Sequence, residues 1–272
     1  MGFCIDQSTR FLRDQGYNVV RLPAEGLAPL DIFGIIDGTP MIVGTVADLV
    51  EEASGELPAA RSGQAANIEG KRTSRMPVSI GIDILGAVLS GLGGNIGVKA
   101  AFETARTLQF TFKKVTRDLV VLADAGAFIE SGTVRWDAMG IREFLSPGGR
   151  LFLVTEVLKS PAVGVSAFAR NKAEIAVDVP AIEAAIGSAE VNVATEGENG
   201  REITFAGAVA LVFGFKCMEL AVTETPSDPD ELRLTFKPVR PGEVALGAER
   251  DNAAPALLSE SGLIGGLPRR AP

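Results

Sequence analysis

The opening stretch MGFCIDQSTRFLRDQGYNVVRLP, residues 1–23, decides how the fold begins. Asp6 is a favourable N-cap for a short helix, and Gly16 is the residue type that commonly follows a helix C-terminus. The apolar run from Tyr17 to Leu22 then predicts a β-strand. Cys4 lies very close to the start of the sequence, which is an unusual place for a core residue.

Composition narrows the class of protein. Of the 272 residues, 46% are apolar but only 6% are aromatic, and 31 are glycine, which favours close packing of small residues. The formal net charge of −8 argues against a nucleic-acid-binding protein. Residues 61–120 nevertheless hold nine Lys or Arg against four Asp or Glu, so one basic segment lies within an acidic chain.

The sequence offers no catalytic constellation. It contains no histidine, which removes Ser-His-Asp and Cys-His catalysis and most zinc sites. Cys4 and Cys217 have no metal-ligand spacing, and a reducing, cytoplasmic setting is their simplest interpretation. The glycine-rich segment 91–97 and the segment Gly70–Thr73 both lack the P-loop pattern. We therefore predict no enzymatic activity, no metal and no non-covalent cofactor.

No secretory signal or spanning helix is evident. Charged residues, including Asp6 and Arg10, interrupt the region where a signal peptide would be apolar. The longest central run without charges, Ile84 to Val98, contains five glycines and is shorter than the ~20 apolar residues that a spanning helix needs. The sequence therefore predicts a water-soluble chain.

Two regions, residues 76–115 and 189–222, show the alternation of strands with one apolar face. In most proteins such strands are simply the half-buried faces of a sheet. Here the first region is basic and has a glycine-rich apolar centre, so these strands could instead form hairpins with one lipid face and one aqueous face. The apolar positions are Val78, Ile80, Ile82, Ile84, Leu108, Phe110, Phe112, Val191, Val193, Ile203 and Phe205.

The overall pattern predicts an α+β protein, a single domain with a twisted, mostly antiparallel central sheet and surrounding helices. Asp37-Gly38 and Asn199-Gly200 are hairpin turn signals. The segment Ala208 to Val222, apolar on both faces, predicts a central strand. Pro161 is expected to separate two strands.

Other segments are less regular. Residues 120–145 are expected to be helical with Trp136 as the core anchor, and residues 53–75 to form a surface loop. The prolines that end at Pro241 mark a boundary between a body, residues 1–240, and a linker and tail, residues 241–272. The tail carries five large aliphatic residues, which normally have a surface to contact. They are Leu257, Leu258, Leu263, Ile264 and Leu267.

The chain resembles the bacterial gasdermins. The likeness is carried by Met1-Gly-Phe-Cys4, by Gly16-Tyr-Asn-Val-Val-Arg-Leu-Pro23, by Pro29-Leu30, by the length of the chain and by its short tail. It extends over essentially the whole chain and is clearest in the first fifty residues. The resemblance implies the gasdermin N-terminal-domain fold, closed by an inhibitory tail.

Cys4 has two interpretations from its position alone, a small buried hydrophobic residue or an S-acylation site. Myristoylation of Gly2 is disfavoured, because that signal needs Ser or Thr at position 6 and the chain has Asp6. The resemblance implies that Cys4 is palmitoylated and that the acyl chain lies in a hydrophobic channel of the resting fold.

The resemblance further implies a pore-forming protein that rests in the cytoplasm as a monomer. A protease, often caspase-like and encoded nearby, would remove the tail. The body would then form a large homo-oligomeric β-barrel pore in the inner membrane and kill the cell in anti-phage defence. Residues 76–115 and 151–222 would supply the inserting hairpins, with the alternating apolar positions facing lipid.

Two smaller sets of residues complete this interpretation. Arg72, Arg75, Lys113 and Lys114 would contact acidic lipids at the membrane surface. Arg240, Leu246 and Arg250 are candidate cleavage positions that look exposed between body and tail. The alternative function is a non-enzymatic adaptor or small-ligand binding module whose tail occupies its own groove.

Overall fold

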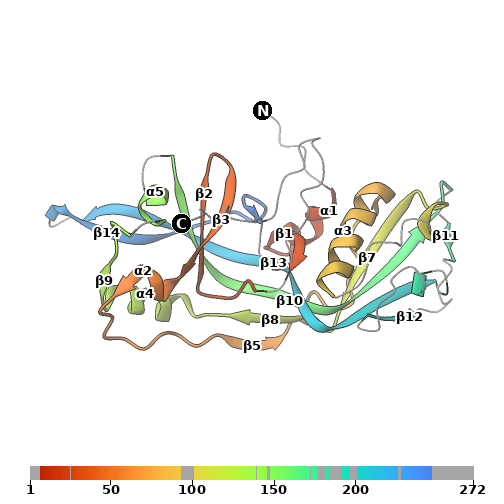
Figure 1. Cartoon of the computed structure of the whole chain (residues 1–272), viewed down its shortest axis with the longest axis horizontal. Helices are drawn as coiled ribbons and strands as arrows, with labels where there is room; N and C mark the ends of the chain where they lie inside the picture. Colours follow the sequence, from red (N-terminus) through yellow and green to blue (C-terminus); the bar gives the residue numbers. More distant parts are fainter. Residues whose placement is uncertain are drawn as a thin grey trace, which may run out of the picture.

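Two long strands, β10 (Arg150–Phe168) and β13 (Glu202–Thr225), run the length of the elongated molecule and organise the rest of it (Figure 1). The computed structural model describes residues 7–24, 26–92, 101–138, 140–145, 148–171, 173–176, 180, 182–183, 191–196, 201–225 and 228–246. The helices are α1 (Gln7–Asp14), α2 (Val46–Leu49), α3 (Val78–Gly91), α4 (Leu122–Glu130) and α5 (Arg142–Leu145). None of the helices in this described part is long and apolar enough to cross a membrane.

The remaining strands are mostly short. They are β1 (Asn18–Ala24), β2 (Asp31–Ile36), β3 (Thr39–Thr45), β4 (Val50–Glu51), β5 (Arg61–Gln64), β6 (Met76–Pro77), β7 (Thr107–Lys113), β8 (Thr116–Leu119), β9 (Thr133–Val134), β11 (Glu174–Ile175), β12 (Asn192–Glu196), β14 (Asp228–Pro238) and β15 (Ala245–Leu246). Among the described residues, thirteen strands form one sheet whose central order is β15-β1-β13-β10-β2-β3. Pairing is antiparallel throughout this part except between β1 and β15. The predicted α+β class with a mostly antiparallel central sheet is confirmed.

Local turn chemistry sets several of these boundaries. Gly16 has a φ of 87°, which ends α1 one turn before β1 begins, as the opening sequence predicts. Asp37 and Gly38 both have positive φ values, 52° and 78°, and they join β2 to β3 in the predicted hairpin. The predicted hairpin around Asn199-Gly200 is also present as the pairing of β12 with β13, although the turn itself lies outside the described residues.

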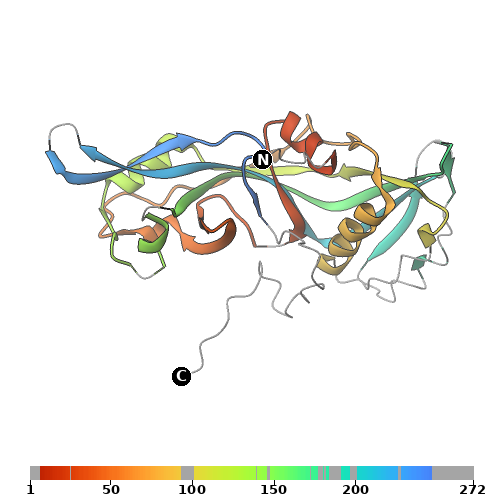
Figure 2. The same ribbon diagram turned by 90° about the horizontal axis from the view of Figure 1, so that it is seen from above.

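Helices α2, α4 and α5 lie in one half of the elongated sheet and α3 in the other, while α1 lies near the middle beside β1 (Figures 1 and 2). Helix α3 covers β7 and the adjoining parts of β10 and β13, with Leu85, Val88 and Leu89 buried against them. At the other end, α2, α4 and α5 pack around Leu151 and Leu153 of β10. A third cluster lies around Phe33, Phe152 and Phe215 and includes residues of β1 and β15. The core is therefore divided along the length of the two long strands.

Residues 78–91 form a helix, so the strand predicted from the alternation of Val78, Ile80, Ile82 and Ile84 is wrong in this state. The same sequence also carries a helical pattern, because its buried residues recur at 81, 85, 88 and 89. Gly81 lets this helix approach β7, since a Cβ there would lie 2.8 Å from Leu108 Cδ1. Packing therefore selects the helical pattern over the alternating one.

The prediction that Pro161 separates two strands is wrong. The 19-residue strand β10 continues through Pro161. The pairing register shifts between Ser160 and Ala162 instead. The Ser160 hydroxyl donates to the Lys113 carbonyl at 2.6 Å and accepts from the Ala162 N–H at 3.2 Å. A β-bulge thus accommodates the residue that lacks an N–H.

Residues 120–145 are not one helical segment with Trp136 at its core. Helices α4 and α5 are separated by β9, and Trp136 is only half-buried. Phe128 and Phe144 are the buried aromatic residues there. Residues 53–75 are exposed for much of their length, but β5 within them pairs with β8.

Candidate functional site

The predicted apolar strand positions meet in one part of the sheet, which we call the two-faced sheet. It consists of β7, residues 162–168 of β10, β12 and residues 202–206 of β13. Opposite residues in neighbouring strands point to the same face, so the register defines the composition of each face. One face is apolar and the other is polar.

The apolar face is built from matched rows across the four strands. Phe112, Val163, Phe205 and Val193 lie opposite one another in sequence across β7, β10, β13 and β12. Phe110, Val165 and Ile203 form the next row, which ends in the exposed Thr195 of β12, and Leu108 lies opposite Ala167. Leu108, Phe110, Ile203 and Phe205 are almost completely buried. The structure therefore brings together the positions predicted in β7, β12 and β13, with Val191 buried in the same cluster.

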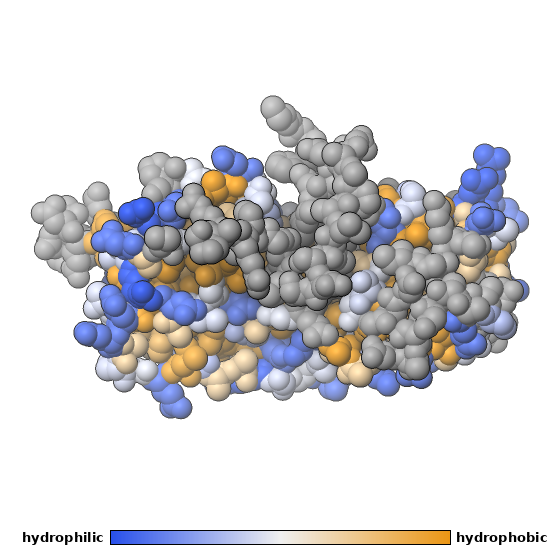
Figure 3. Space-filling model, in the orientation of Figure 1, coloured by the Kyte–Doolittle hydropathy of each residue, from blue (hydrophilic) through white to orange (hydrophobic). Residues whose placement is uncertain are grey.

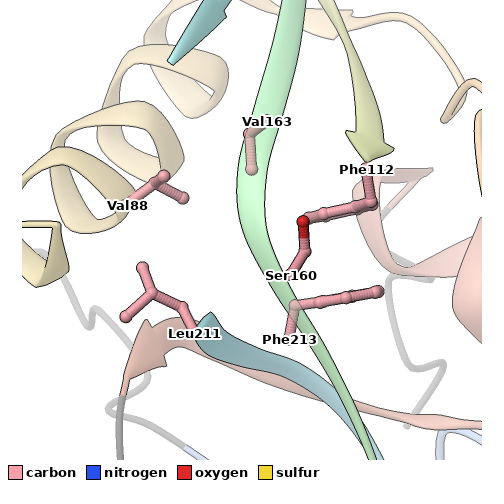
Figure 4. Close-up of a pocket in the computed structure, with 6 residues that line it drawn as sticks. All are labelled: Val88, Phe112, Ser160, Val163, Leu211 and Phe213. Atoms are coloured by element: carbon pink, nitrogen blue, oxygen red, sulfur yellow. The ribbon is translucent and has the colours of Figure 1, made fainter. Parts of the chain in front are cut away.

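Helix α3 is the element that covers this face. Val78, Ile82 and Ile84 of the helix pack partly against the cluster, whereas Ile80 is 37% exposed. A small cavity remains between helix and sheet where Val88 approaches Val163 and Leu211 (Figure 4). The rings of Phe112 and Phe213 stack beside it with centroids 3.9 Å apart. The part of the cover that α3 provides is a helix of low polarity, and Phe102 and Ile182 are buried in the same cluster.

The surface is correspondingly mixed. The face seen in Figure 3 shows apolar areas broken by hydrophilic residues. The exposed large apolar side chains among the described residues are Leu57, Ile80, Val209, Val222 and Leu232. The apolar face of the two-faced sheet contributes little to this surface, because most of its side chains are buried.

The polar face carries charged and hydroxyl side chains. Thr111, Gly164 and Thr204 form its central row. Lys113 forms ion pairs with Glu196 and Glu202 across this row. The sheet therefore already has the alternation of apolar and polar faces that strands at a membrane need.

The four predicted basic residues are not gathered in one patch. Arg72 reaches Glu202 at 4.0 Å, and Lys113 contacts the same carboxylate. The guanidinium of Arg75 lies over the Phe168 ring, 3.6 Å from its centroid. Lys114 is exposed and has a φ of 55°. In the resting structure Lys113 is therefore engaged within the protein, and contact of the four residues with lipid stays a prediction.

A polar group that the sequence analysis missed joins the first β-strand to the centre of the sheet. The buried Tyr17 hydroxyl donates to Glu156, which also accepts from Lys216 Nζ at 3.0 Å. Burial and the hydrogen bond to Glu156 raise the pKa of Tyr17, so its hydroxyl stays a donor at physiological pH. Lys216 Nζ also lies 4.4 Å from the Tyr17 ring centroid. No sequence signal pairs Tyr17 with Glu156, because 139 residues separate them.

The neighbouring Asn18 holds the chain that follows β14. Its side-chain oxygen accepts from the N–H groups of Gly242 and Val244 at 2.9 and 3.4 Å, and its amide nitrogen lies 3.8 Å from Cys217 Sγ. Asn18 is 3% exposed. The final described residues then pair in parallel with β1, Val20 opposite Leu246.

An ion pair adds to this attachment. Arg150 contacts Glu219 at 2.5 Å and Glu243 at 2.7 Å. The hydrogen bond from Arg150 holds the pKa of Glu243 below its usual value. The segment from Gly242 to Leu246 is therefore part of the body, with Val244 and Leu246 buried in its core.

This placement corrects one expectation about the cleavage candidates. Leu246 is 1% exposed and lies in β15, so it is not an exposed linker residue. Arg240 is exposed. Cys4, Arg250 and the tail residues Leu257, Leu258, Leu263, Ile264 and Leu267 lie outside the described residues. Within the described part, no group of three or more His, Cys, Asp or Glu could hold a metal ion.

Comparisons with known proteins identify the family of this chain. A family model described as the Bacterial Gasdermin Family matches residues 20–231. The gasdermin bGSDM of Vitiosangium sp. (strain GDMCC 1.1324) is 34% identical over 269 residues, 97% of this chain and 98% of that protein. The gasdermin bGSDM of Lysobacter enzymogenes is 32% identical over 221 residues, 80% of this chain and 81% of that protein.

A solved structure shares the fold. The structure of a bacterial gasdermin from Bradyrhizobium tropiciagri aligns with a TM-score of 0.59 at 20% identity, over 86% of this chain and 92% of that chain. The chain therefore belongs to the bacterial gasdermin family. Gasdermins are pore-forming proteins rather than enzymes, which defines the class of function.

Proposed function

We propose that this chain is an autoinhibited pore-forming protein, activated when a protease removes its C-terminal tail. The observation that carries the proposal is the two-faced sheet, whose apolar face lies beneath α3 and is buried in the same core cluster. Moving α3 away would uncover apolar side chains of β7, β10 and β13, with Val193 of β12 beside them. The opposite, polar face would then line the water-filled side of a membrane sheet.

Helix α3 itself would join the inserting strands. Val78, Ile80, Ile82 and Ile84 alternate with Ser79, Gly81 and Asp83, so an extended conformation would place the apolar residues on one face. Residues 76–115 would then form one hairpin beside a second from residues 151–222. Arg72, Arg75, Lys113 and Lys114 would lie near acidic lipid headgroups, and the body would assemble into a large homo-oligomeric β-barrel pore.

The proposed resting state is a cytoplasmic monomer, and the proposed active state lies in the inner membrane. The inhibitory segment would begin after Leu246, because residues 242–246 are buried or hydrogen-bonded in the body. Arg250 would then suit cleavage better than Leu246. A neighbouring protease, caspase-like or otherwise, would cut the tail during phage infection, and the pore would kill the infected cell.

The decisive experiment is dye release from liposomes. A specific protease site is placed at residue 250, and release is measured with and without complete cleavage. We expect release only after cleavage, and none when the same site is made uncleavable. Tight vesicles after complete cleavage would contradict the proposal and would favour an adaptor or ligand-binding module with a self-docked tail.

We also propose that Cys4 carries a palmitoyl group in the resting protein. Burying a long acyl chain is worth up to ~0.8 kcal/mol per CH₂, enough to bias either the resting or the membrane state. Intact mass after expression in a native host should exceed the sequence mass by one palmitoyl group. Cys4→Ala should abolish the excess, whereas Cys217→Ala should keep it, because Cys217 is only 5% exposed. An unmodified wild-type mass would contradict this assignment.

A further inference from the structure

Four charged side chains converge on the polar face of the two-faced sheet, Lys113, Glu196, Glu202 and Arg72, which lies 4.0 Å from Glu202. Lys113 Nζ lies 2.6 Å from Glu202 Oε1 and 2.8 Å from Thr204 Oγ1, and it also pairs with Glu196. The Thr111 hydroxyl donates to the other oxygen of Glu202 at 3.0 Å. The side chains of Lys113 and Glu202 are only 18% and 10% exposed. This pair is therefore largely shielded from water, although it lies on a polar surface.

The pair joins two strands that are not neighbours. Lys113 in β7 is opposite Ala162 of β10, and Glu202 in β13 is opposite Ser166 of β10. The positions opposite them in β10 lie two residues to either side of Gly164, so the two side chains meet above Gly164. A Cβ at Gly164 would lie 2.7 Å from Glu202 Oε1 and 3.1 Å from Lys113 Cε. The φ of Gly164 lies outside the left-handed region, so the space above it, and not its backbone conformation, calls for glycine.

We propose that Lys113 and Glu202 are positioning residues for membrane insertion, an inference that rests on the proposed function. Lys113 belongs to the first inserting region, and Glu196 and Glu202 belong to the second. Their contact fastens the two regions across β10 and fixes their relative register. The four strands therefore reach the bilayer as one preformed amphipathic unit.

Register matters here because of the period of a strand. A slip of one residue in β7 would move Phe110 and Phe112 to the polar face and bring Lys113 to the lipid face. A charge on the lipid face of a membrane strand is destabilising, whereas the lumen face tolerates it. A partly buried ion pair is also better suited to selecting one arrangement than to adding stability. The ion pair between Lys113 and Glu202 is therefore expected to affect the rate of pore formation more than the stability of the folded protein.

The test compares Lys113→Met with a control at a pair of similar burial, Asp118→Asn. Asp118 of β8 pairs with Lys159 of β10, and these side chains are 15% and 29% exposed. Asp118 lies outside the two-faced sheet and outside both regions proposed to insert. We expect Lys113→Met to slow dye release after complete cleavage by about ten-fold, while Asp118→Asn stays close to wild type at a similar loss of thermal stability.

A second variant separates the ion pair from general strand stability. Gly164→Ala should be neutral or stabilising in an ordinary strand, because glycine weakens strands. Here the added Cβ displaces the Glu202 carboxylate, so we expect slower dye release. Wild-type release by Gly164→Ala and Lys113→Met would overturn the proposal.

The same variants also test the inference in the uncut protein, where no pore forms. In the uncut protein, Lys113→Met should speed hydrogen exchange of β7 and β12 amides, and Asp118→Asn should not. The pair has only an ordinary structural role if both variants change hydrogen exchange equally. The same conclusion follows if each variant slows dye release only in proportion to the stability it loses. If cleaved wild-type protein leaves vesicles tight, the proposed function fails, and the exchange result still decides whether Lys113 fastens the two regions.

Discussion

Strands β10 and β13 pass through two regions of the molecule that are packed in different ways. Around residues 151–157 of β10 both faces are buried, one beneath α2, α4 and α5 and the other against Phe33 and Phe215. Around residues 162–168 one face is apolar and lies against α3, and the other carries Gly164 and Ser166. The same pair of strands is thus a fixed core in one region and a separable layer in the other.

Side-chain composition explains the difference. The stretch Leu151–Val154 is apolar at every position, so each face needs its own cover. The stretch Ala162–Ala167 alternates Val163 and Val165 with Gly164 and Ser166, which gives it one apolar and one polar face, although all six residues are buried in this structure. The part of the sheet that would rearrange in the proposed mechanism is therefore the part that lies against α3.

The largest expected effect is in the fixed core. Phe152 is fully buried and stacks on Phe33 with centroids 4.9 Å apart. We expect Phe152→Ala to lower the free energy of unfolding by about 3–5 kcal/mol, as measured by urea denaturation. Phe112→Ala, beneath α3 and beside the small cavity, should cost about 1 kcal/mol less because the helix can settle. An equal or larger loss at Phe112 would remove the contrast between the regions.

An intermediate effect is expected where α3 touches β7. In Gly81→Ala the new Cβ would meet Leu108 Cδ1 at 2.8 Å and Leu108 Cβ at 2.9 Å. We expect a loss of about 1–3 kcal/mol and faster dye release after cleavage, because the helix is pushed from the sheet. Gly126→Ala in α4 is the control, since its Cβ would meet only Phe236 at 3.3 Å. Slower release by Gly81→Ala would contradict α3 as the cover that moves.

The attachment of residues 242–246 to β1 tests how far the fixed region extends. Asn18→Ala leaves the N–H groups of Gly242 and Val244 without their acceptor, which costs about 1–3 kcal/mol when such groups are buried. Hydrogen exchange of residues 242–246 should increase, whereas the exposed Asn192→Ala should have no effect there. Unchanged exchange in Asn18→Ala would place these residues outside the fixed region.

The smallest effect concerns pH. The pKa of Glu243 is lowered in the folded protein, so its stabilisation is present above the ordinary glutamate pKa of 4.5 and is lost as pH falls through the folded value. Because the Arg150–Glu243 pair is about one-third exposed, we expect less than about 1 kcal/mol. Glu243→Gln should remove this part of the pH dependence of unfolding below pH 4.5. An unchanged pH profile would mean that the pair adds no stability.

Several features followed directly from the sequence. Alternation placed Leu108, Phe110 and Phe112 on one face of β7, and the Asp37-Gly38 turn fixed a hairpin. These features depend on residues close together in the chain, for which side-chain period and backbone preference are sufficient. The contacts of Tyr17 with Glu156 and of Asn18 with Gly242 could not be predicted, because each joins segments more than a hundred residues apart.

The sequence by itself thus determined the family, the mostly antiparallel sheet and which side chains share a strand face. Only the tertiary structure decided that residues 78–91 are helical and that β10 continues through Pro161. It also decided that Leu246 is buried against β1 and that Lys113 meets Glu202 over Gly164. The physical reason is common to all four. Local preference allowed more than one conformation at each place, and packing against distant segments selected one of them.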